Sequence, residues 1–286
     1  MQAIKNYSKL VKFEHTLFAL PFALIGFFLA VAQSHSHLSW ILFLQVLLCM
    51  VFARNAAMGF NRFLDRKFDK MNPRTAGREV PAGIIKPKQA LIFVIINSIL
   101  FIGATWFINR LCFYLSPVAL FTILFYSYTK RFTALCHFVL SLGLAIAPVG
   151  AYLAVTGIFN WPPLLIGTIV FFWVSGFDII YALQDEEFDK ENRLKSIPSY
   201  FGKKHALRLS VAVHIISALF VILTGIVVQG GWFHWAGAAV FIISLIHQHR
   251  LVKPDDLSKV NLAFFTTNGI ASVVYGTLVI TDLLVS

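Results

Sequence analysis

Residues 162–191, PPLLIGTIVFFWVSGFDIIYALQDEEFDKE, contain the pattern that decides the fold. The stretch begins with an apolar run of about 20 residues, which is the length that a helix needs to cross a lipid bilayer. Asp178 lies inside this run, and Asp185 and Asp189 follow at its end. An ionisable residue within a membrane helix is costly in free energy and indicates a function. The stretch therefore predicts a membrane-spanning helix with a polar site at one end.

The composition of the whole chain also indicates a membrane protein. Of its 286 residues, 58% are hydrophobic and 13% are charged, whereas a soluble domain carries about 25% charged residues. This composition excludes an ordinary soluble protein, a disordered chain and a nucleic-acid-binding module, although the net charge is +11. The three cysteines, Cys49, Cys112 and Cys136, have no CxxC spacing, so we expect neither a disulfide framework nor a zinc site. We do not expect a cleavable signal peptide at the N-terminus, because the apolar run there is too long.

Nine apolar segments are candidates for membrane spans. They are residues 16–33, 39–60, 90–107, 111–128, 132–156, 162–183, 206–229, 232–246 and 262–284. The sequence thus predicts an all-α, polytopic membrane protein. We expect a bundle of nine transmembrane helices that forms a single domain over residues 1–286.

The basic residues are distributed unevenly between the two ends of these spans. If the N-terminus is cytoplasmic, every Lys and Arg residue except Arg110 falls on the cytoplasmic side, including Lys12 near the N-terminus. The positive-inside rule supports this orientation. We therefore predict an integral protein of the inner (cytoplasmic) membrane of a bacterium. Its N-terminus and the loops after the second and sixth spans would be cytoplasmic, and its C-terminus would lie outside.

The first acid cluster follows the second predicted span. Asn61, Asp65 and Asp69 recur every four residues, so on a helix they line one face. Arg54 continues the same face toward the membrane. The first acid motif should therefore lie at the cytoplasmic end of the second helix.

The second acid cluster follows the sixth predicted span. Asp178, Tyr181, Asp185 and Asp189 are separated by steps of three, four and four, so a continuous helix would place them on one face. Asp178 would lie inside the membrane, about two turns from the loop. The second motif should therefore lie at the cytoplasmic end of the sixth helix.

The two clusters together predict a site for a metal-bound diphosphate. Mg²⁺ takes a few carboxylate ligands and completes its shell with water or substrate phosphate oxygens. Acidic side chains alone would repel an anion, but basic side chains that suit phosphate oxygens lie near both clusters. These are Arg66, Lys67, Lys70, Arg74, Arg78, Lys130, Arg131 and Lys195.

The sequences of the two motifs resemble those of the UbiA superfamily of intramembrane prenyltransferases, and most closely those of its 4-hydroxybenzoate polyprenyltransferase branch. The resemblance rests on NRFLDRKFD from Asn61, RTAGREVPAG from Arg74, YSYTKR from Tyr126 and DIIYALQDEEFD from Asp178. It covers essentially the whole chain. It implies transfer of a polyprenyl group from an allylic polyprenyl diphosphate to 4-hydroxybenzoate or a related aromatic acid, with Mg²⁺ as cofactor, in ubiquinone or menaquinone biosynthesis.

The resemblance also implies roles for individual residues. The expected metal ligands are Asn61, Asp65, Asp69, Asp185 and Asp189. The expected contacts to the diphosphate or the acceptor are Arg54, Asn61, Lys67, Arg74, Arg78, Lys130, Arg131 and Lys195. The expected catalytic residues are Asp65, Asp178, Tyr181 and Asp185. Asp178 would orient the phenol of the acceptor, accept its proton or stabilise the allylic cation, and Tyr181 would donate a hydrogen bond to the substrate or to a carboxylate.

Several alternatives stay open at this point. The acceptor could instead be a dihydroxynaphthoate, homogentisate or protohaem. An ion-coupled membrane transporter is an alternative of another class, since acids within a membrane also mark ion pathways. A CDP-alcohol phosphotransferase is disfavoured, because its continuous acid signature is missing from the sequence. The expected partners are the two substrates and the lipid bilayer, with no nucleic acid and no obligate protein partner.

Overall fold

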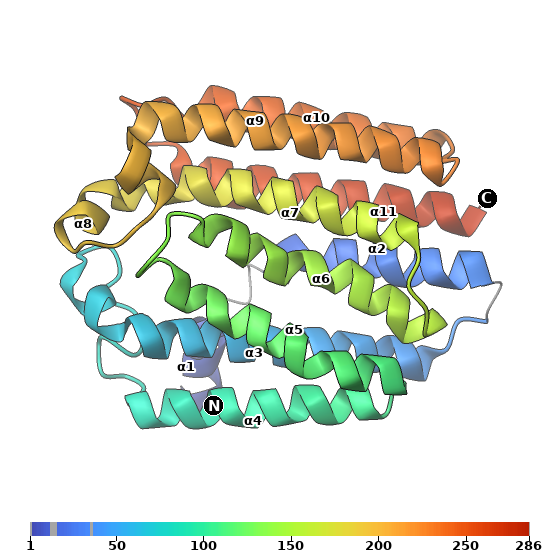
Figure 1. Ribbon diagram of the computed structural model, residues 1–286, viewed down its shortest axis with the longest axis horizontal. Helices are drawn as coiled ribbons and strands as arrows, with labels where there is room; N and C mark the ends of the chain where they lie inside the picture. Colours follow the sequence, from blue (N-terminus) through green and yellow to red (C-terminus); the bar gives the residue numbers. More distant parts are fainter. Residues whose placement is uncertain (1, 12–15, 35–36, 286) are drawn as a thin grey trace. The chain divides into compact units, whose positions relative to one another are not determined.

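The chain is helical almost throughout (Figure 1). A computed structural model describes residues 2–11, 16–34 and 37–285, so that Lys12 lies outside the described residues. Within these ranges the β-structure is limited to one isolated bridge between Lys253 and Asp256. The helices form two compact units, and each is described by itself.

The first unit comprises Met1–Thr16 and Trp40–Tyr128. Its helices are α1 (Gln2–Val11), α3 (Trp40–Met71), α4 (Pro87–Trp106) and α5 (Arg110–Thr129). Helix α3 packs against α4 and also contacts α1. Asn55 of α3 donates a hydrogen bond of 3.0 Å to Asn97 of α4, which joins the two helices by a polar contact within their apolar surfaces.

The second unit comprises Leu17–Ser39 and Thr129–Ser286. Its long helices are α2 (Thr16–Ser34), α6 (Cys136–Thr156), α7 (Trp161–Ala182), α9 (Ile197–Val227), α10 (Trp232–Leu251) and α11 (Asn268–Val285). Three short elements complete it: the 3₁₀ turn η2 (Leu183–Asp185), α8 (Glu186–Glu191) and the π-helical segment η3 (Leu262–Thr267). Helix α7 packs against α6 and α9, and its fully buried Trp173 lies in the main apolar core.

Two close approaches fix helix packing in the second unit. A Cβ atom at Gly26 of α2 would overlap the backbone carbonyl of Pro148 in α6, and one at Gly176 of α7 would overlap the ring of His214 in α9. Glycine is required at both positions because only the absence of a side chain lets the helices come this close.

A carboxylate holds the beginning of α10. Asp282 of α11 is only 6% exposed, and its Oδ2 atom accepts a hydrogen bond of 2.7 Å from the backbone N–H of Gly231. The first N–H groups of a helix have no partner within the helix. Asp282 therefore supplies one from a segment 51 positions away in the sequence.

The predicted membrane architecture is confirmed in its main features. A helix occupies each of the predicted segments. In the described part of the chain, seven helical stretches are long and apolar enough to cross a membrane. The remaining two segments are α2, whose apolar part Phe18–Ser34 is shorter, and α10. The count of nine spans stays a prediction.

Two details differ from the expected helices. The sixth predicted segment does not continue as one α-helix through the acid motif, because the chain tightens into the 3₁₀ turn η2 after Ala182. Such turns are common where an α-helix ends. The helix predicted to begin at residue 206 begins at Ile197 instead, with a non-helical Gly202 (φ 78°) within it. Because η2 interrupts the α-helix, the steps of three, four and four residues in the second motif do not place its members on one regular helix face.

Candidate active site

The first acid motif lies in the last turns of α3. Asp65 and Asp69 are 3% and 6% exposed, although acidic residues are almost never so buried without partners. Asn61 donates a hydrogen bond of 3.1 Å to Oδ2 of Asp65, one helical turn away. The predicted spacing thus brings Asn61 and Asp65 into direct contact.

Asp69 uses its two carboxylate oxygens differently. Its Oδ1 atom forms an ion pair of 2.7 Å with Arg78, and its backbone carbonyl accepts a hydrogen bond from the Thr75 hydroxyl. Both partners belong to the turns that follow α3. The Oδ2 atom of Asp69 is buried and has no hydrogen-bond partner. Since buried polar atoms are normally satisfied, this oxygen is available to a cation.

The predicted basic residues around the first motif occupy different surroundings. Arg78 is the one paired with Asp69. Lys67 and Arg74 are exposed. Arg66 donates to the carbonyl of Phe63 and lies over the Phe63 ring. Arg54 donates a hydrogen bond of 3.4 Å to the carbonyl of Val11 at the end of α1.

Arg62 was not expected to belong to the site. It is 4% exposed and donates a hydrogen bond of 3.3 Å to Oδ1 of Asn61. A cation buried beside the acid motif offsets part of the negative charge of Asp65 and Asp69. Arg62 directly follows Asn61 in the sequence, but it lies off the helix face that the four-residue spacing of the acids defines.

The second acid motif is distributed over three elements. Asp178 lies in α7, Asp185 ends η2, and Asp189 lies in α8. Asp189 is 8% exposed, and both Asp185 and Lys130 lie close enough to act on it electrostatically. Asp189 thus lies within electrostatic range of both residues, and their common role in substrate binding stays a prediction.

The segment around Lys130 is joined to the loop that follows α8. The carbonyl of Lys130 accepts a hydrogen bond of 2.6 Å from the backbone N–H of Lys195. The exposed ammonium group of Lys195 donates to the carbonyl of Phe132 at 3.1 Å. Lys195 therefore ties these two segments together, while Arg131 is half-buried beside them.

Tyr181 lies on an aromatic surface. Its ring centroid is 4.1 Å from that of Phe264, with an interplanar angle of 30°. Phe264 belongs to η3, and π-helical turns are frequent at functional sites because they redirect side chains. The ring of Tyr181 is therefore positioned by packing from a segment more than 80 residues away in the sequence.

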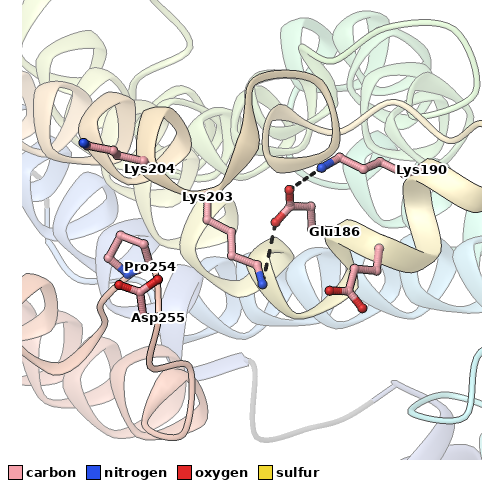
Figure 2. Close-up of a pocket in the computed structure, with 7 residues that line it drawn as sticks. Glu186, Lys190, Lys203, Lys204, Pro254 and Asp255 are labelled. Atoms are coloured by element: carbon pink, nitrogen blue, oxygen red, sulfur yellow. Dashed lines mark hydrogen bonds and ion pairs between the residues drawn. The ribbon is translucent and has the colours of Figure 1, made fainter.

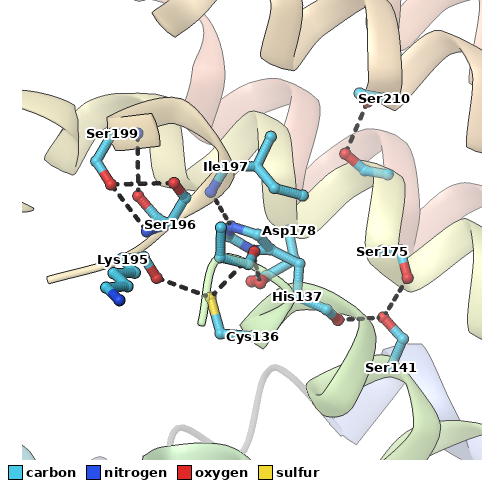
Figure 3. A network of polar contacts seen from close by, with 12 residues as sticks. Cys136, His137, Ser141, Ser175, Asp178, Lys195, Ser196, Ile197, Ser199 and Ser210 are labelled. Carbon is cyan, nitrogen blue, oxygen red and sulfur yellow. Dashed lines mark hydrogen bonds and ion pairs between the residues drawn. The ribbon is translucent and has the colours of Figure 1, made fainter. Parts of the chain in front are cut away.

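Asp178 has a partner that the sequence did not predict (Figure 3). The Nδ1 atom of His137, in the first turn of α6, lies 2.6 Å from Oδ2 of Asp178. His137 is 3% exposed. The contact depends on how α6 packs against α7, and the sequence offered only a polar residue at the start of an apolar run.

A surface pocket of about 530 Å³ lies beside α8 (Figure 2). Within it the carboxylate of Glu186 accepts a hydrogen bond of 2.5 Å from Lys190 and lies 3.9 Å from the ammonium group of Lys203. The lining is Glu186, Glu187, Lys190, Lys203, Lys204, Pro254 and Asp255. None of the residues predicted to bind substrate or metal contributes to this pocket.

Each unit offers side-chain oxygen atoms of the kind that Mg²⁺ binds. In the described ranges, no three His, Cys, Asp or Glu side chains form a group that would hold a metal ion. Asn61 with Asp65, the buried Oδ2 atom of Asp69, and Asp185 beside Asp189 provide oxygen donors. Mg²⁺ commonly takes one or two carboxylates and completes its shell with substrate phosphates and water. The residues present therefore fit the ion.

Comparison with known proteins gives the family. The sequence profile of the UbiA prenyltransferase family matches residues 19–270. The chain is 28% identical to a 4-hydroxybenzoate octaprenyltransferase of Aliivibrio fischeri (strain MJ11) over 238 residues, 82% of each chain. It is 30% identical to the 4-hydroxybenzoate octaprenyltransferase of Alcanivorax borkumensis over 204 residues, 71% of this chain and 70% of the relative.

Solved structures of the family have the same fold. A UbiA homolog from Aeropyrum pernix K1 aligns with a TM-score of 0.84 and 28% identity, covering 94% of this chain and 98% of that one. A UbiA homolog from Archaeoglobus fulgidus, bound to GPP and Mg²⁺, aligns with a TM-score of 0.74 and 20% identity, covering 96% and 99%. The family profile is that of a prenyltransferase, so the alternative of an ion-coupled transporter is wrong. With a family profile that spans most of its length and a matching fold, this chain belongs to the UbiA prenyltransferase family of integral membrane enzymes.

Proposed function

We propose that this chain transfers a polyprenyl group from an allylic polyprenyl diphosphate to an aromatic acid, with 4-hydroxybenzoate as the favoured acceptor, in quinone biosynthesis. Family membership supports prenyl transfer. The similar octaprenyltransferases that act on 4-hydroxybenzoate support this acceptor over dihydroxynaphthoate, homogentisate and protohaem. A protein of the same fold that is bound to GPP and Mg²⁺ supports a metal-bound diphosphate.

One observation carries the proposal: Asp65 and Asp69 are buried at the end of an apolar helix, and one oxygen of Asp69 lacks a hydrogen-bond partner. Buried carboxylates that are incompletely satisfied cost free energy, which a bound cation offsets. Asn61, Asp65, Asp69, Asp185 and Asp189 would hold Mg²⁺. A bound Mg²⁺ ion would neutralise negative charge on the diphosphate.

The remaining residues act on the substrates directly. When the bond from the prenyl C1 atom to the diphosphate breaks, its electron pair leaves with the diphosphate, and basic side chains stabilise that charge. A ring carbon of the acceptor then supplies the electron pair of the new C–C bond and loses its proton. We assign phosphate or acceptor contacts to Arg54, Asn61, Lys67, Arg74, Arg78, Lys130, Arg131 and Lys195.

Asp178 and Tyr181 would act at the reacting carbon together with Asp65 and Asp185. Asp178 lies in α7, one to two helical turns before Asp185. Its carboxylate would orient the phenol of the acceptor and stabilise positive charge. The apolar helices would exclude the water that otherwise quenches an allylic cation.

The same proposal includes the topology. We infer that α2 and α10 cross the membrane together with the seven longer stretches, which gives nine spans, and that both units belong to one catalytic domain over residues 1–286. The distribution of Lys and Arg supports a cytoplasmic N-terminus and cytoplasmic acid motifs in a bacterial inner membrane.

The test uses membranes that contain the chain, labelled farnesyl diphosphate and a panel of acceptors. We expect prenylated 4-hydroxybenzoate with Mg²⁺, and a reversible loss of product on chelation. Asp65→Asn and Asp185→Asn should abolish turnover while the protein still inserts. Asp256→Asn is the matched control, because Asp256 lies in an exposed turn and bonds to Ser258. Full activity in excess chelator, or prenylation of protohaem alone, would overturn the proposal.

A further inference from the structure

His137 is held against Asp178 within the second unit (Figure 3). Its Nδ1 atom lies 2.6 Å from Oδ2 of Asp178. Hydrogen bonds to a carboxylate at this separation are short and strong. The side chain of His137 is 4% exposed and that of Asp178 is 22% exposed. Asp178 is therefore accessible to a substrate, whereas His137 acts only through its neighbours.

The second ring nitrogen of His137 fixes the position of the ring proton. The backbone N–H of Ile197, at the beginning of α9, donates to Nε2 at 3.3 Å. A backbone amide nitrogen can only donate, so Nε2 must offer its lone pair. We assign the neutral tautomer with the proton on Nδ1, because a proton on Nε2 would face the N–H of Ile197. His137 thus donates to Asp178, which accepts as an anion.

The backbone of His137 is fixed as well. Its carbonyl accepts a hydrogen bond of 2.6 Å from the hydroxyl of Ser141, and the hydroxyl of Ser175 in α7 donates to Ser141 at 2.7 Å. Both serines are fully buried. The ring of His137 is therefore oriented by contacts from α6, α7 and the start of α9.

From these contacts we propose that His137 is a positioning residue for the reaction. It keeps the carboxylate of Asp178 in one orientation, as an anion, with its accessible side toward the aromatic acceptor. This inference rests on the proposed function of Asp178. The Ile197 contact extends the arrangement, because Ile197 follows the loop that carries Lys195. The position of that loop and the orientation of Asp178 are thus joined through one imidazole ring.

Three substitutions separate positioning from packing. His137→Leu removes the donor. His137→Asn places an amide N–H near the position of Nδ1 and can still donate to Asp178, whereas His137→Gln places its amide N–H near Nε2, opposite the N–H of Ile197. His247→Leu is the control, because His247 is an exposed histidine of α10.

We expect His137→Leu to lower kcat by about 10- to 100-fold, since small misplacements of a reacting group have effects of this size. The KM for the prenyl diphosphate should not change. The kcat of His137→Asn should be close to that of wild type, whereas the kcat of His137→Gln should be as low as that of His137→Leu. In an Asp178→Asn background, His137→Leu should have no further effect, because the two residues act as a unit. His247→Leu should behave as wild type.

Two outcomes overturn the inference. One is equal activity of His137→Asn and His137→Gln, and the other is a multiplicative loss in the double variant with Asp178→Asn. If His137→Leu fails to fold, the comparison of Asn with Gln still decides. Each result is read against thermal unfolding of the same purified variants.

A measurement without turnover separates this inference from the proposed function. In protein with ¹⁵N-labelled histidine, the ring resonances that disappear in His137→Asn report the tautomer of His137. We expect protonated Nδ1 and unprotonated Nε2. The opposite tautomer, or a ring protonated at both nitrogens, overturns the inference even if prenyl transfer is observed. The expected tautomer without prenyl transfer on any acceptor overturns the proposed function and leaves the placement of Asp178 supported.

Discussion

Asp69 combines two opposite environments in one side chain. Its Oδ1 atom is neutralised by Arg78, whereas Oδ2 is buried without a hydrogen-bond partner. Leaving a buried acceptor unsatisfied costs about 1–3 kcal/mol. An unsatisfied buried group in a native structure needs an explanation, and a bound ion is one such explanation. The unsatisfied oxygen is consistent with the proposed role of Asp69 as a ligand of the metal ion.

Asp69→Asn should therefore weaken Mg²⁺-dependent binding of a prenyl diphosphate by at least about 10- to 100-fold, because even the partners that orient a metal ligand contribute that much to metal affinity. The measurement is equilibrium binding of labelled geranyl diphosphate to purified protein, with and without Mg²⁺. Asp256→Asn serves as the control. Unchanged affinity in Asp69→Asn would remove Asp69 from the set of metal ligands.

Individual residues also show what the sequence could and could not predict. The contact of Asn61 with Asp65 follows from helix periodicity, because both lie on one helix. The contact of His137 with Asp178 joins helices whose packing is decided by many apolar side chains, so no local pattern contains it. Arg62 was not predicted for a different reason: the four-residue spacing selects the face of Asn61, Asp65 and Asp69, and the residue next to Asn61 lies off that face.

The helical segments themselves were predicted well, and their ends were predicted less well. Apolar length and flanking charge are properties of a local segment, so the sequence reports them directly. The 3₁₀ turn η2 and the π-helical η3 are small departures from α-helical geometry. Both segments occur where side chains from distant parts of the chain pack together, as Tyr181 does on Phe264. The periodicity of apolar residues does not predict such local changes of helix type.

Helix packing at Gly26 gives a prediction for stability. Gly26→Ala places a Cβ atom against the carbonyl of Pro148 and should destabilise the protein by about 1–3 kcal/mol, as overpacking does. Gly150→Ala in α6 is the matched control, because no atom lies within 4 Å of the added Cβ. Unfolding of both variants in the same detergent measures the difference. Equal free energies of unfolding for the two variants would show that α2 and α6 can move apart at Gly26 at little cost.

For the whole molecule, the sequence predicts an orientation in the membrane that labelling can measure. Cys49, Cys112 and Cys136 are first replaced by serine, and single cysteines are then introduced at the exposed Lys70, Lys195 or Ser39. A membrane-impermeant maleimide should label Lys70→Cys and Lys195→Cys only from the cytoplasmic side. It should label Ser39→Cys only from the other side, since Ser39 lies in an uncharged connection.

Labelling of positions 70 and 195 from opposite sides would contradict a shared site for the two acid motifs. The motifs belong to different compact units. Their residue types and spacing could be predicted from the sequence, whereas a common site depends on contacts between distant segments. Topology is thus the whole-molecule property that most directly tests the proposed reaction.

The hydrogen bond between Asp282 and Gly231 has a consequence for biosynthesis. A ribosome adds the residues from Gly231 to Asp282 one after another, so α10 is made before its carboxylate partner exists. During this interval the N–H of Gly231 must be satisfied by water or lipid headgroups. The start of α10 therefore lacks this partner until α11 has been made, and a chain truncated after residue 270 should be cleaved by protease near Gly231 more readily than the full chain.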